Sequence, residues 1–346
     1  MTMTITSVAA LLLSFFLLSS QASKSPSARH QHPSRRDVTI NDNLTIATCT
    51  ATSSQPNPIA QEYAQDVTGT LNATLAIVPI PLSTARELVP SQWTILEDAY
   101  RALLPAFPEG MYPVLMQAGL DHDIQLAAYD ISVADFQRIG WSFPFIDLLG
   151  DGFSSFTWAP AQLISAANEI AITGSQAYGT FVAPAVFDQS CDAYSQSADG
   201  SVHFAARATT TVETLISDTV ANQNSSLYAT INFSPLSSTG ADAQTNMNPY
   251  PIDFYKNVTN QPIFANGSQC DSQVRLFNST INQGAYAPVP VKGAIYSNLQ
   301  PLNQSIIDAA EREYGIFGIL VDTPFIEYNL LDCQSLAGSS GTGSGD

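Results

Sequence analysis

Short apolar runs separated by polar turns dominate the chain, and most of them have the character of β-strands. Residues 73–82, "ATLAIVPIPL", are aliphatic and closed by prolines, which favours a strand over a helix. A short helix should follow over residues 83–90, with Ser83 as its N-cap and Pro90 as its stop. The pattern predicts a strand that leads directly into a two-turn helix.

The rest of the chain continues this alternation. Residues 111–120 and 124–132 are expected to pair as strands joined by an acidic turn, Asp121 to Asp123. Two later helices should end at Gly174 and at Gly315. Further strand-like runs, rich in β-branched or aromatic residues, cover residues 154–165, 205–217 and 225–236. The predicted class is α+β, dominated by antiparallel sheet.

Composition bounds the size of the fold and its partners. The chain has 346 residues, of which 45% are hydrophobic, enough for a sizeable core. We expect one domain over residues 45–335. Only 12% of residues are charged and the net charge is -18, which repels phosphate backbones and anionic lipid surfaces. Nucleic acid is therefore not expected as a partner.

The ends of the chain indicate a secretory route. Residues 1–22 carry an apolar run followed by small residues, as in a signal peptide, and residues 23–36 read as a polar pro-segment ending in Arg35-Arg36. Residues 336–346 read as a flexible tail without an anchor signal. We expect a secreted, extracellular product of a fungal or other eukaryotic cell, with no membrane association after signal removal.

Cysteines and glycosylation motifs indicate the same compartment. Two disulfides are expected, and Cys49 with Cys333 and Cys191 with Cys270 is the favoured pairing among the three possible ones. The Asn-x-Ser/Thr motifs concentrate between residues 224 and 278, so that region is expected to be exposed and rich in loops. The motifs start at Asn43, Asn72, Asn224, Asn232, Asn257, Asn266, Asn278 and Asn303.

Three segments, in order, resemble the acetoacetate decarboxylase superfamily. Residues 75–90, "LAIVPIPLSTARELVP", are similar to its strand and short helix. Residues 164–184, "ISAANEIAITGSQAYGTFVAP", are similar to its "AIxxGREx(W/Y)GxPKK" segment, and residues 284–296, "GAYAPVPVKGAIY", to its late "APLxxLPVxEI" strand. The resemblance implies an antiparallel, cone-like β-barrel whose interior holds a small carbonyl compound.

In that family a lysine after the glycine-rich turn forms a Schiff base with a β-keto acid, aided by a second lysine that lowers its pKa. The match places Gln176 on the family's glutamate, Tyr178 on its aromatic residue and Val182 on the reactive lysine. A further family glutamate would fall on Ile131, beside Asp130. Schiff-base decarboxylation by the family route is therefore not expected.

Other chemistry has little support in the sequence. Lys292 is the best remaining amine, but strand alternation is expected to point it outward. The sequence Asp121-His122-Asp123 is explained by a turn, and with His203 as the only other histidine of the mature chain no metal site is expected. No GxSxG motif occurs, and no cofactor is implied. Plausible inward acids are Asp130, Asp147 and Glu169.

The resemblance leaves two main functional hypotheses. In the first, the protein acts non-covalently on a small carbonyl or polyketide-like compound, as a lyase, cyclase or isomerase, with Asp130, Gln176 and Tyr178 as catalytic groups. In the second, it binds such a molecule without turnover; an unrelated secreted hydrolase is a third alternative. The oligomeric state stays open. The residues expected to contact the small molecule are Gln117, Tyr129, Trp158, Phe181 and Lys292.

Overall fold

The structure is a computed structural model and describes residues 55–209, 226–236, 247–277 and 281–339. The described residues belong to a compact unit, Thr48–Asp346. The expected signal peptide and pro-segment, residues 1–36, lie outside the described residues, as does Cys49. Over the described ranges, no helix is both long and apolar enough to cross a bilayer.

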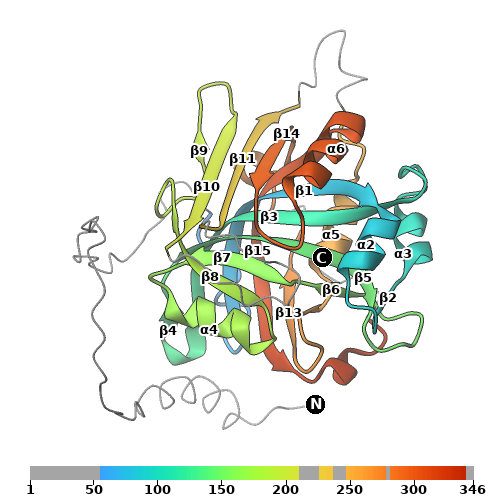
Figure 1. The fold of residues 1–346 in the computed structure, drawn as a ribbon. Coiled ribbons are helices and arrows are strands. Elements are labelled where there is room, and N and C mark those ends of the chain that lie inside the picture. Colours follow the sequence, from blue (N-terminus) through green and yellow to red (C-terminus); the bar gives the residue numbers. More distant parts are fainter. Residues whose placement is uncertain (1–54, 210–225, 237–246, 278–280, 340–346) are drawn as a thin grey trace, which may run out of the picture. The chain divides into compact units, whose positions relative to one another are not determined.

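The strands form a mixed sheet that closes on itself (Figure 1). The pairings β7–β8 and β6–β12 are parallel, and the remaining pairings between described strands are antiparallel. The strands are β1 (Val67–Pro81), β2 (Thr94–Ile95), β3 (Met111–Leu126), β4 (Ile131–Val133), β5 (Phe136–Asp147), β6 (Phe156–Trp158), β7 (Ala161–Ser165), β8 (Phe181–Phe187), β9 (Ser195–Gln196), β10 (Val202–Ala208), β11 (Tyr228–Pro235), β12 (Ile263–Phe264), β13 (Cys270–Arg275), β14 (Val289–Ser297) and β15 (Ile316–Leu331).

The helices are short; α4 lies beside β7 and β8, and α6 lies beside β1 and β14 (Figure 1). They are α2 (Leu82–Leu88), α3 (Glu97–Leu103), α4 (Glu169–Ala177), α5 (Ile252–Thr259) and α6 (Gln304–Tyr314), with short 3-10 turns η1 (Ala127–Tyr129), η2 (Gly284–Tyr286) and η3 (Cys333–Leu336). Asn168 and Asn303 cap α4 and α6 by accepting backbone N–H bonds from Ala171 and Ile306. The predicted α+β class, dominated by antiparallel sheet, is confirmed.

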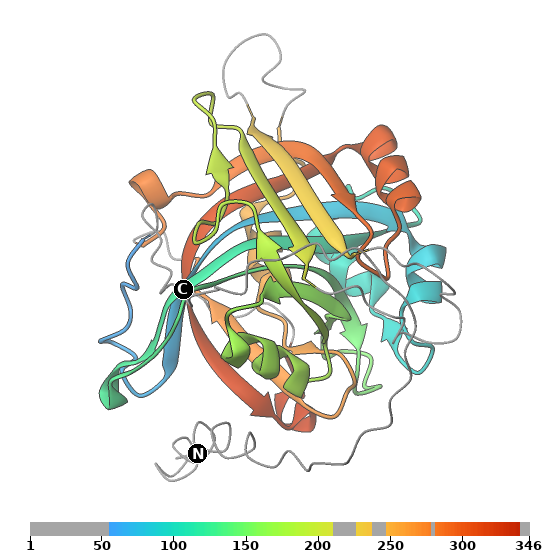
Figure 2. The same cartoon turned by 60° about the vertical axis from the view of Figure 1, so that its left-hand side comes forward.

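Strand pairing produces two closed circuits that share a wall. The large ring runs β1–β3–β5–β7–β8–β10–β11–β14–β15 and returns to β1. The small ring runs β1–β3–β5–β6–β12–β13–β15. The shared wall is β5–β3–β1–β15, which explains why β1 and β3 are buried on both faces. Figure 2 shows these long strands crossing between β10–β11 and β13.

The register fixes which interior each side chain of the wall faces. Directly paired residues share a face of the sheet. On β11, Ile231 and Phe233 are buried while Asn232 and Ser234 are exposed, so the former face the interior of the large ring. Following the pairs through β14 and β15 places the even-numbered residues of β1, β3 and β15 on that interior. The odd-numbered ones face the small ring.

The predicted acidic turn at residues 121–123 is wrong. These residues lie inside β3 (Met111–Leu126), where the pairing with β1 shifts register between Thr68 and Thr70 and Asp123 has a φ of 50°. Asp121 and His122 point to opposite faces, and each finds buried polar partners there, so a polar triplet fits within a strand that separates two interiors. Consecutive polar residues indicate a turn in a sheet that has one buried and one solvated face, whereas β3 is buried on both faces.

Several other boundaries differ from the prediction. Residues 154–165 form two strands, β6 and β7, separated at Ala159 and Pro160. Pro81, without a side-chain hydrogen bond, occupies the N-cap of α2 in place of Ser83. Helix α4 continues through Gly174 to Ala177, whereas α6 ends at Gly315 as predicted.

Two regions expected to be loose are part of the folded structure. Residues 247–277 contain α5, β12 and β13, with much of α5 buried, so the expectation of an exposed loop region is wrong there. The predicted tail begins later than residue 336. Gly338 donates its backbone N–H to Ser154 Oγ at 2.8 Å, and Ser155 donates to the carbonyl of Ser339 at 2.8 Å.

The favoured cysteine pairing is wrong. Cys270 is bonded to Cys333, which ties the start of β13 to the turn after β15. These strands are neighbours in the small ring, so their ends meet although 63 residues separate the cysteines. Cys191 is also disulfide-bonded. Wide sequence spacing carries no information about such a contact.

Candidate functional site

The residues predicted to be catalytic do not meet at one place. Asp130 is exposed and adopts φ 54° at the end of η1, and Gln176 is exposed on α4. Tyr178 is buried at the end of α4. Tyr129 is half-buried within η1. Asp130 and Gln176 thus face solvent while Tyr178 is buried, and no side-chain hydrogen bond or ion pair joins these three described residues into one site.

The predicted contact residues are also dispersed. Trp158 is buried, and its Nε1–H donates to the carbonyl of Ala265 at 3.2 Å. Phe181 is partly buried against the main core. Gln117 faces the small ring and accepts a hydrogen bond from Arg275. These residues pack within the fold at separate positions.

The two positions tied to Schiff-base chemistry hold no interior amine. Val182 is buried against Ile164 and Ala171 beneath α4. Lys292 is exposed on β14, with Nζ 5.0 Å from the centre of the Phe317 ring. The expected outward direction of Lys292 is confirmed, and with it the prediction of Lys292 as a ligand contact in the interior is wrong.

A network that we call the Arg138 cluster fills the small ring. Arg138 forms a bidentate ion pair with Asp121, at 2.7 Å and 2.9 Å, and also donates to Gln273 at 3.0 Å. Arg275, fully buried, donates to Gln273 at 2.6 Å and to Gln117 at 3.0 Å. Both guanidinium groups thus have several partners inside the protein, although Nε of each arginine makes no hydrogen bond.

The acids of this cluster have perturbed proton affinities. Burial raises the pKa of Asp271 well above its ordinary range, and the charge of Glu327 adds to the effect. Burial also raises the pKa of Glu327 and of Asp121, although Arg138 opposes it in both. Burial lowers the pKa of Arg275 to about 10, so its guanidinium stays charged at neutral pH. The cluster is a strongly coupled structural network across the small ring.

A second polar group, which we call the His122 cluster, lies on the opposite side of the shared wall. Several of its buried side-chain atoms lack the hydrogen-bond partner that buried polar groups normally have. Its core residues are His122 on β3 and Asp322 on β15, with Thr70 and Thr74 on β1. In and around this cluster, the buried side-chain atoms without a hydrogen-bond partner include His122 Nε2, Asp322 Oδ1, Thr70 Oγ1, Thr74 Oγ1, Gln55 Oε1 and Asn282 Oδ1; the Arg138 cluster also contains such atoms, among them Arg138 Nε and Asp271 Oδ1.

The imidazole of His122 is held by two carboxylates. Nδ1 lies 2.9 Å from Asp123 Oδ2, a hydrogen bond, whereas Nε2 lies 3.6 Å from Asp322 Oδ1, too far for one. Burial alone would lower the pKa of His122, but Asp322 and Asp123 outweigh it, so the pKa is raised above 6.5. Nδ1 is thus committed to Asp123, and Nε2 is the nitrogen available for chemistry.

Neighbouring residues fix Asp322 and cover the cluster. The backbone N–H of Gln55 donates to Asp322 Oδ2 at 2.7 Å, and Asn282 Nδ2 donates to the Asp322 carbonyl at 3.0 Å. Gln137, on the large-ring face of β5, donates to the carbonyls of Gln189 and Asp192 at 2.6 and 2.8 Å. These bonds hold the segment around residues 189–192 against the large-ring face of β5.

The cluster reaches the protein surface at one point. The side chain of Asp123 is 51% exposed, while that of His122 is 1% exposed. Burial and the charge of Asp322 raise the pKa of Tyr194 to about 12, which places its phenol near the same carboxylate. In the described part of the chain, no group of three or more His, Cys, Asp or Glu side chains is arranged to hold a metal ion.

Sequence reasoning missed Asp322 and assigned His122 to a turn. The available signal was the run of Thr70, Asn72 and Thr74 on one face of an otherwise apolar strand. Hydroxyl and amide groups at every second position of a buried strand indicate a polar interior. The contact with Asp322 bridges segments that are remote in sequence, and local pattern does not reveal it.

Comparison with solved structures finds similar chains at low sequence identity. The enduracididine biosynthesis enzyme MppR with HEPES buffer bound is 9% identical over 77% of this chain and 88% of that chain, with a TM-score of 0.41. An acetoacetate decarboxylase-like enzyme from Sphingomonas wittichii RW1 is 7% identical over 77% and 94%, with a TM-score of 0.37.

One further solved structure is similar to this chain at the same low identity. MppR complexed with the condensation product of pyruvate and imidazole 4-carboxaldehyde is 10% identical over 81% of this chain and 95% of that chain, with a TM-score of 0.39. No family model and no curated protein matches the chain. Its activity has to be inferred from its own residues.

Proposed function

We propose that the protein transfers protons on a small carbonyl compound without forming an imine, and that the His122 cluster is the site. The observation that carries this proposal is a buried histidine whose Nδ1 is bonded to Asp123 while its Nε2 is unsatisfied and faces Asp322. A carboxylate behind one ring nitrogen and an acid or base in front of the other is the arrangement used in general acid–base catalysis.

The distances suit a paired transfer. With His122 protonated, Nε2–H donates to the carbonyl oxygen of the compound, and Asp322 Oδ1 removes a proton from the adjacent carbon. The products are the enol, a neutral imidazole and a carboxylic acid, and reversal of the steps at either carbon gives isomerisation. Nε2 and Oδ1 are 3.6 Å apart, a separation that one small molecule bound beside them would span.

The surrounding unsatisfied atoms suit a compound that also carries hydroxyl groups. Asn282 Oδ1 and Gln55 Oε1 are acceptors, and the hydroxyls of Thr70 and Thr74 both donate and accept. Leaving such atoms unpaired costs about 1–3 kcal/mol each, which a hydroxylated ligand recovers by bonding to them. An apolar ligand recovers none of it.

We also propose that the protein works outside the cell. The disulfide between Cys270 and Cys333 supports this, because disulfides persist in oxidising compartments. The net charge of -18 disfavours nucleic acid and anionic membranes as partners.

The proposed function is tested by solvent-deuterium incorporation into hydroxyacetone and pyruvate, followed by proton NMR. We expect exchange with the purified protein and at least a hundredfold slower exchange with His122→Gln or Asp322→Asn, in the range that a lost acid–base catalyst costs. Asp130→Asn is the matched control, because this carboxylate is exposed, and it should exchange at the normal rate.

Two results would contradict the proposal. Binding of both compounds without exchange would indicate a binding protein. Reduction with borohydride in the presence of acetylacetone should leave every lysine unlabelled; labelling of Lys256 or Lys292 together with loss of activity would show imine chemistry instead.

A further inference from the structure

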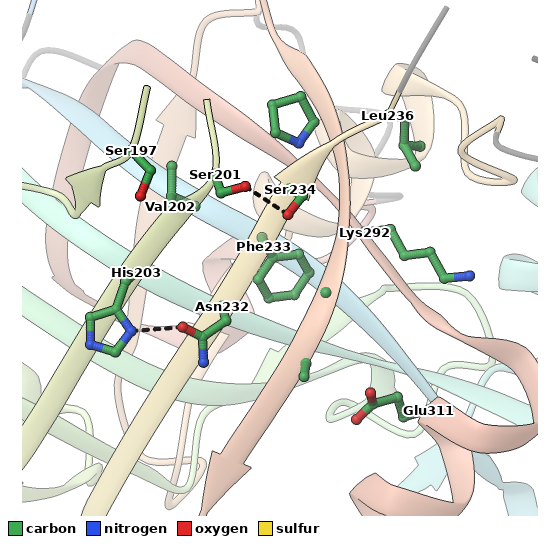
Figure 3. A pocket seen from close by; sticks show the side chains of 13 residues that line it. Ser197, Ser201, Val202, His203, Asn232, Phe233, Ser234, Leu236, Lys292 and Glu311 are labelled. Atoms are coloured by element: carbon green, nitrogen blue, oxygen red, sulfur yellow. Dashed lines mark hydrogen bonds between the residues drawn. The ribbon is translucent and has the colours of Figure 1, made fainter. Parts of the chain in front are cut away.

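A groove lies on the outer face of the large ring, away from both interior clusters (Figure 3). It has a volume of about 610 Å³, within the size range of small-ligand sites. Strands β10, β11 and β14 form its floor and α6 forms one side. Its polar lining includes Ser201, His203, Asn232, Ser234, Lys292 and Glu311.

Asn232 stands in this groove and begins the motif Asn232-Phe233-Ser234. Its side chain is exposed, and its Oδ1 lies 2.8 Å from His203 Nδ1. This bond fixes the amide with Oδ1 toward His203, as Figure 3 shows. N-glycosylation modifies the amide nitrogen and keeps the oxygen, so the bond to His203 survives modification.

The other described motifs are less suitable. Asn72 lies in the middle of β1 and Asn257 within α5, and both are buried, which disfavours a glycan at either position. The amide nitrogen of Asn266 is packed against Gly179, where an added Cβ would lie 2.5 Å from it. Asn303 is exposed at the N-cap of α6. The motifs at Asn43, Asn224 and Asn278 lie outside the described residues.

We propose that Asn232 carries an N-linked glycan whose first sugars lie in this groove. The inference is independent of the His122 cluster, which faces the interior of the large ring, whereas the groove lies on the outer face of that ring. The groove would then bind the first N-acetylglucosamine units of a glycan that is attached to the same chain.

The lining matches the chemistry of such sugars, which carry hydroxyl and acetamide groups on a ring with apolar faces. Ser201 and Ser234, whose hydroxyls are 2.8 Å apart, offer both donors and acceptors. Lys292 offers a cation and Glu311 an acceptor from the α6 side. Pro235 and Leu236 provide apolar surface at the end of β11.

The test uses the full chain, secreted from a eukaryotic host, and glycopeptide mass spectrometry. We expect glycan at Asn232 and at Asn303 and none at Asn72 or Asn257. A peptide-N-glycosidase should release the Asn232 glycan from the native protein about tenfold more slowly than the Asn303 glycan, a ratio that one or two retained sugar–protein hydrogen bonds produce. After denaturation the two rates should be equal.

A variant of the groove distinguishes binding of the glycan in the groove from the presence of a glycan on Asn232. Lys292→Gln combined with Glu311→Gln leaves the motif intact and changes only exposed or groove-lining side chains. Release from Asn232 should then accelerate toward the rate at Asn303. An unmodified Asn232, whether or not Asn303 is modified, would overturn the proposal, and so would equal release rates from both sites of the native protein.

Discussion

Replacing Arg138 with methionine removes the cation that neutralises a buried carboxylate. Asp121 is 1% exposed and receives two contacts from the guanidinium, at 2.7 and 2.9 Å. Without them the carboxylate stays in the small ring with no equivalent partner. Breaking a buried pair in this way costs about 3–5 kcal/mol of unfolding free energy, whereas an exposed pair costs about 0–1 kcal/mol.

The pair term is isolated by a double-mutant cycle with Asp121→Leu, measured by urea unfolding at pH 7. We expect a coupling of at least about 2 kcal/mol, because the double variant removes the stranded charge together with its partner. Removal of Arg138 also raises the pKa of Asp121 further, so the folded state then binds this proton more tightly than the unfolded state does. The deficit of Arg138→Met should therefore shrink as the pH falls. A single-variant cost below about 1 kcal/mol would refute the assignment of a buried ion pair.

Three further predictions concern the wall, the disulfide and the histidine. Gly119→Ala should destabilise the protein by several kcal/mol, because its Cβ would lie 2.3 Å from the Asn72 carbonyl oxygen. Gly174→Ala, whose Cβ would have no atom within 4 Å, should stabilise α4 by up to about 1 kcal/mol. Thermal unfolding of the two variants compares these effects. Replacing both Cys270 and Cys333 with serine should cost about 4 kcal/mol by urea unfolding, from a separation of 63 residues, and no loss would indicate that the bridge does not form. Because the pKa of His122 is raised, its charge stabilises the fold fully below pH 6.5, and this contribution disappears as pH rises through the folded pKa. His122→Gln should abolish that dependence, and an unchanged pH–stability curve would contradict it.

Apolar runs predicted the main elements because strand and helix periodicity is local. The runs at β1 and α6 were placed correctly, since proline and Gly315 mark their ends. The same reasoning failed at Asp121–Asp123, where alternate residues enter two different polar interiors. Period-two alternation applies to a strand with one face on the core and one face in solvent. The strands β1 and β3 of the shared wall are buried on both faces.

The site was less accessible to sequence reasoning than the fold. Motif matching directed attention to Gln176 and Asp130, which are exposed, and away from His122, whose partner Asp322 lies two hundred residues further along the chain. Tyr178 is buried, but its hydroxyl lies beside Gln162 on β7 and makes no hydrogen bond with His122. Such pairings depend on how strands close into rings, and no local signal encodes them.

The central claim is that His122 titrates inside the large ring with Nε2 directed at a bound carbonyl compound. Nitrogen-15 NMR of the imidazole, recorded across a pH series with and without hydroxyacetone, tests it directly. The account predicts a pKa above 6.5 and a change of the Nε2 resonance when hydroxyacetone is added. A pKa at or below 6.5, or an Nε2 resonance unaffected by the compound, would contradict it.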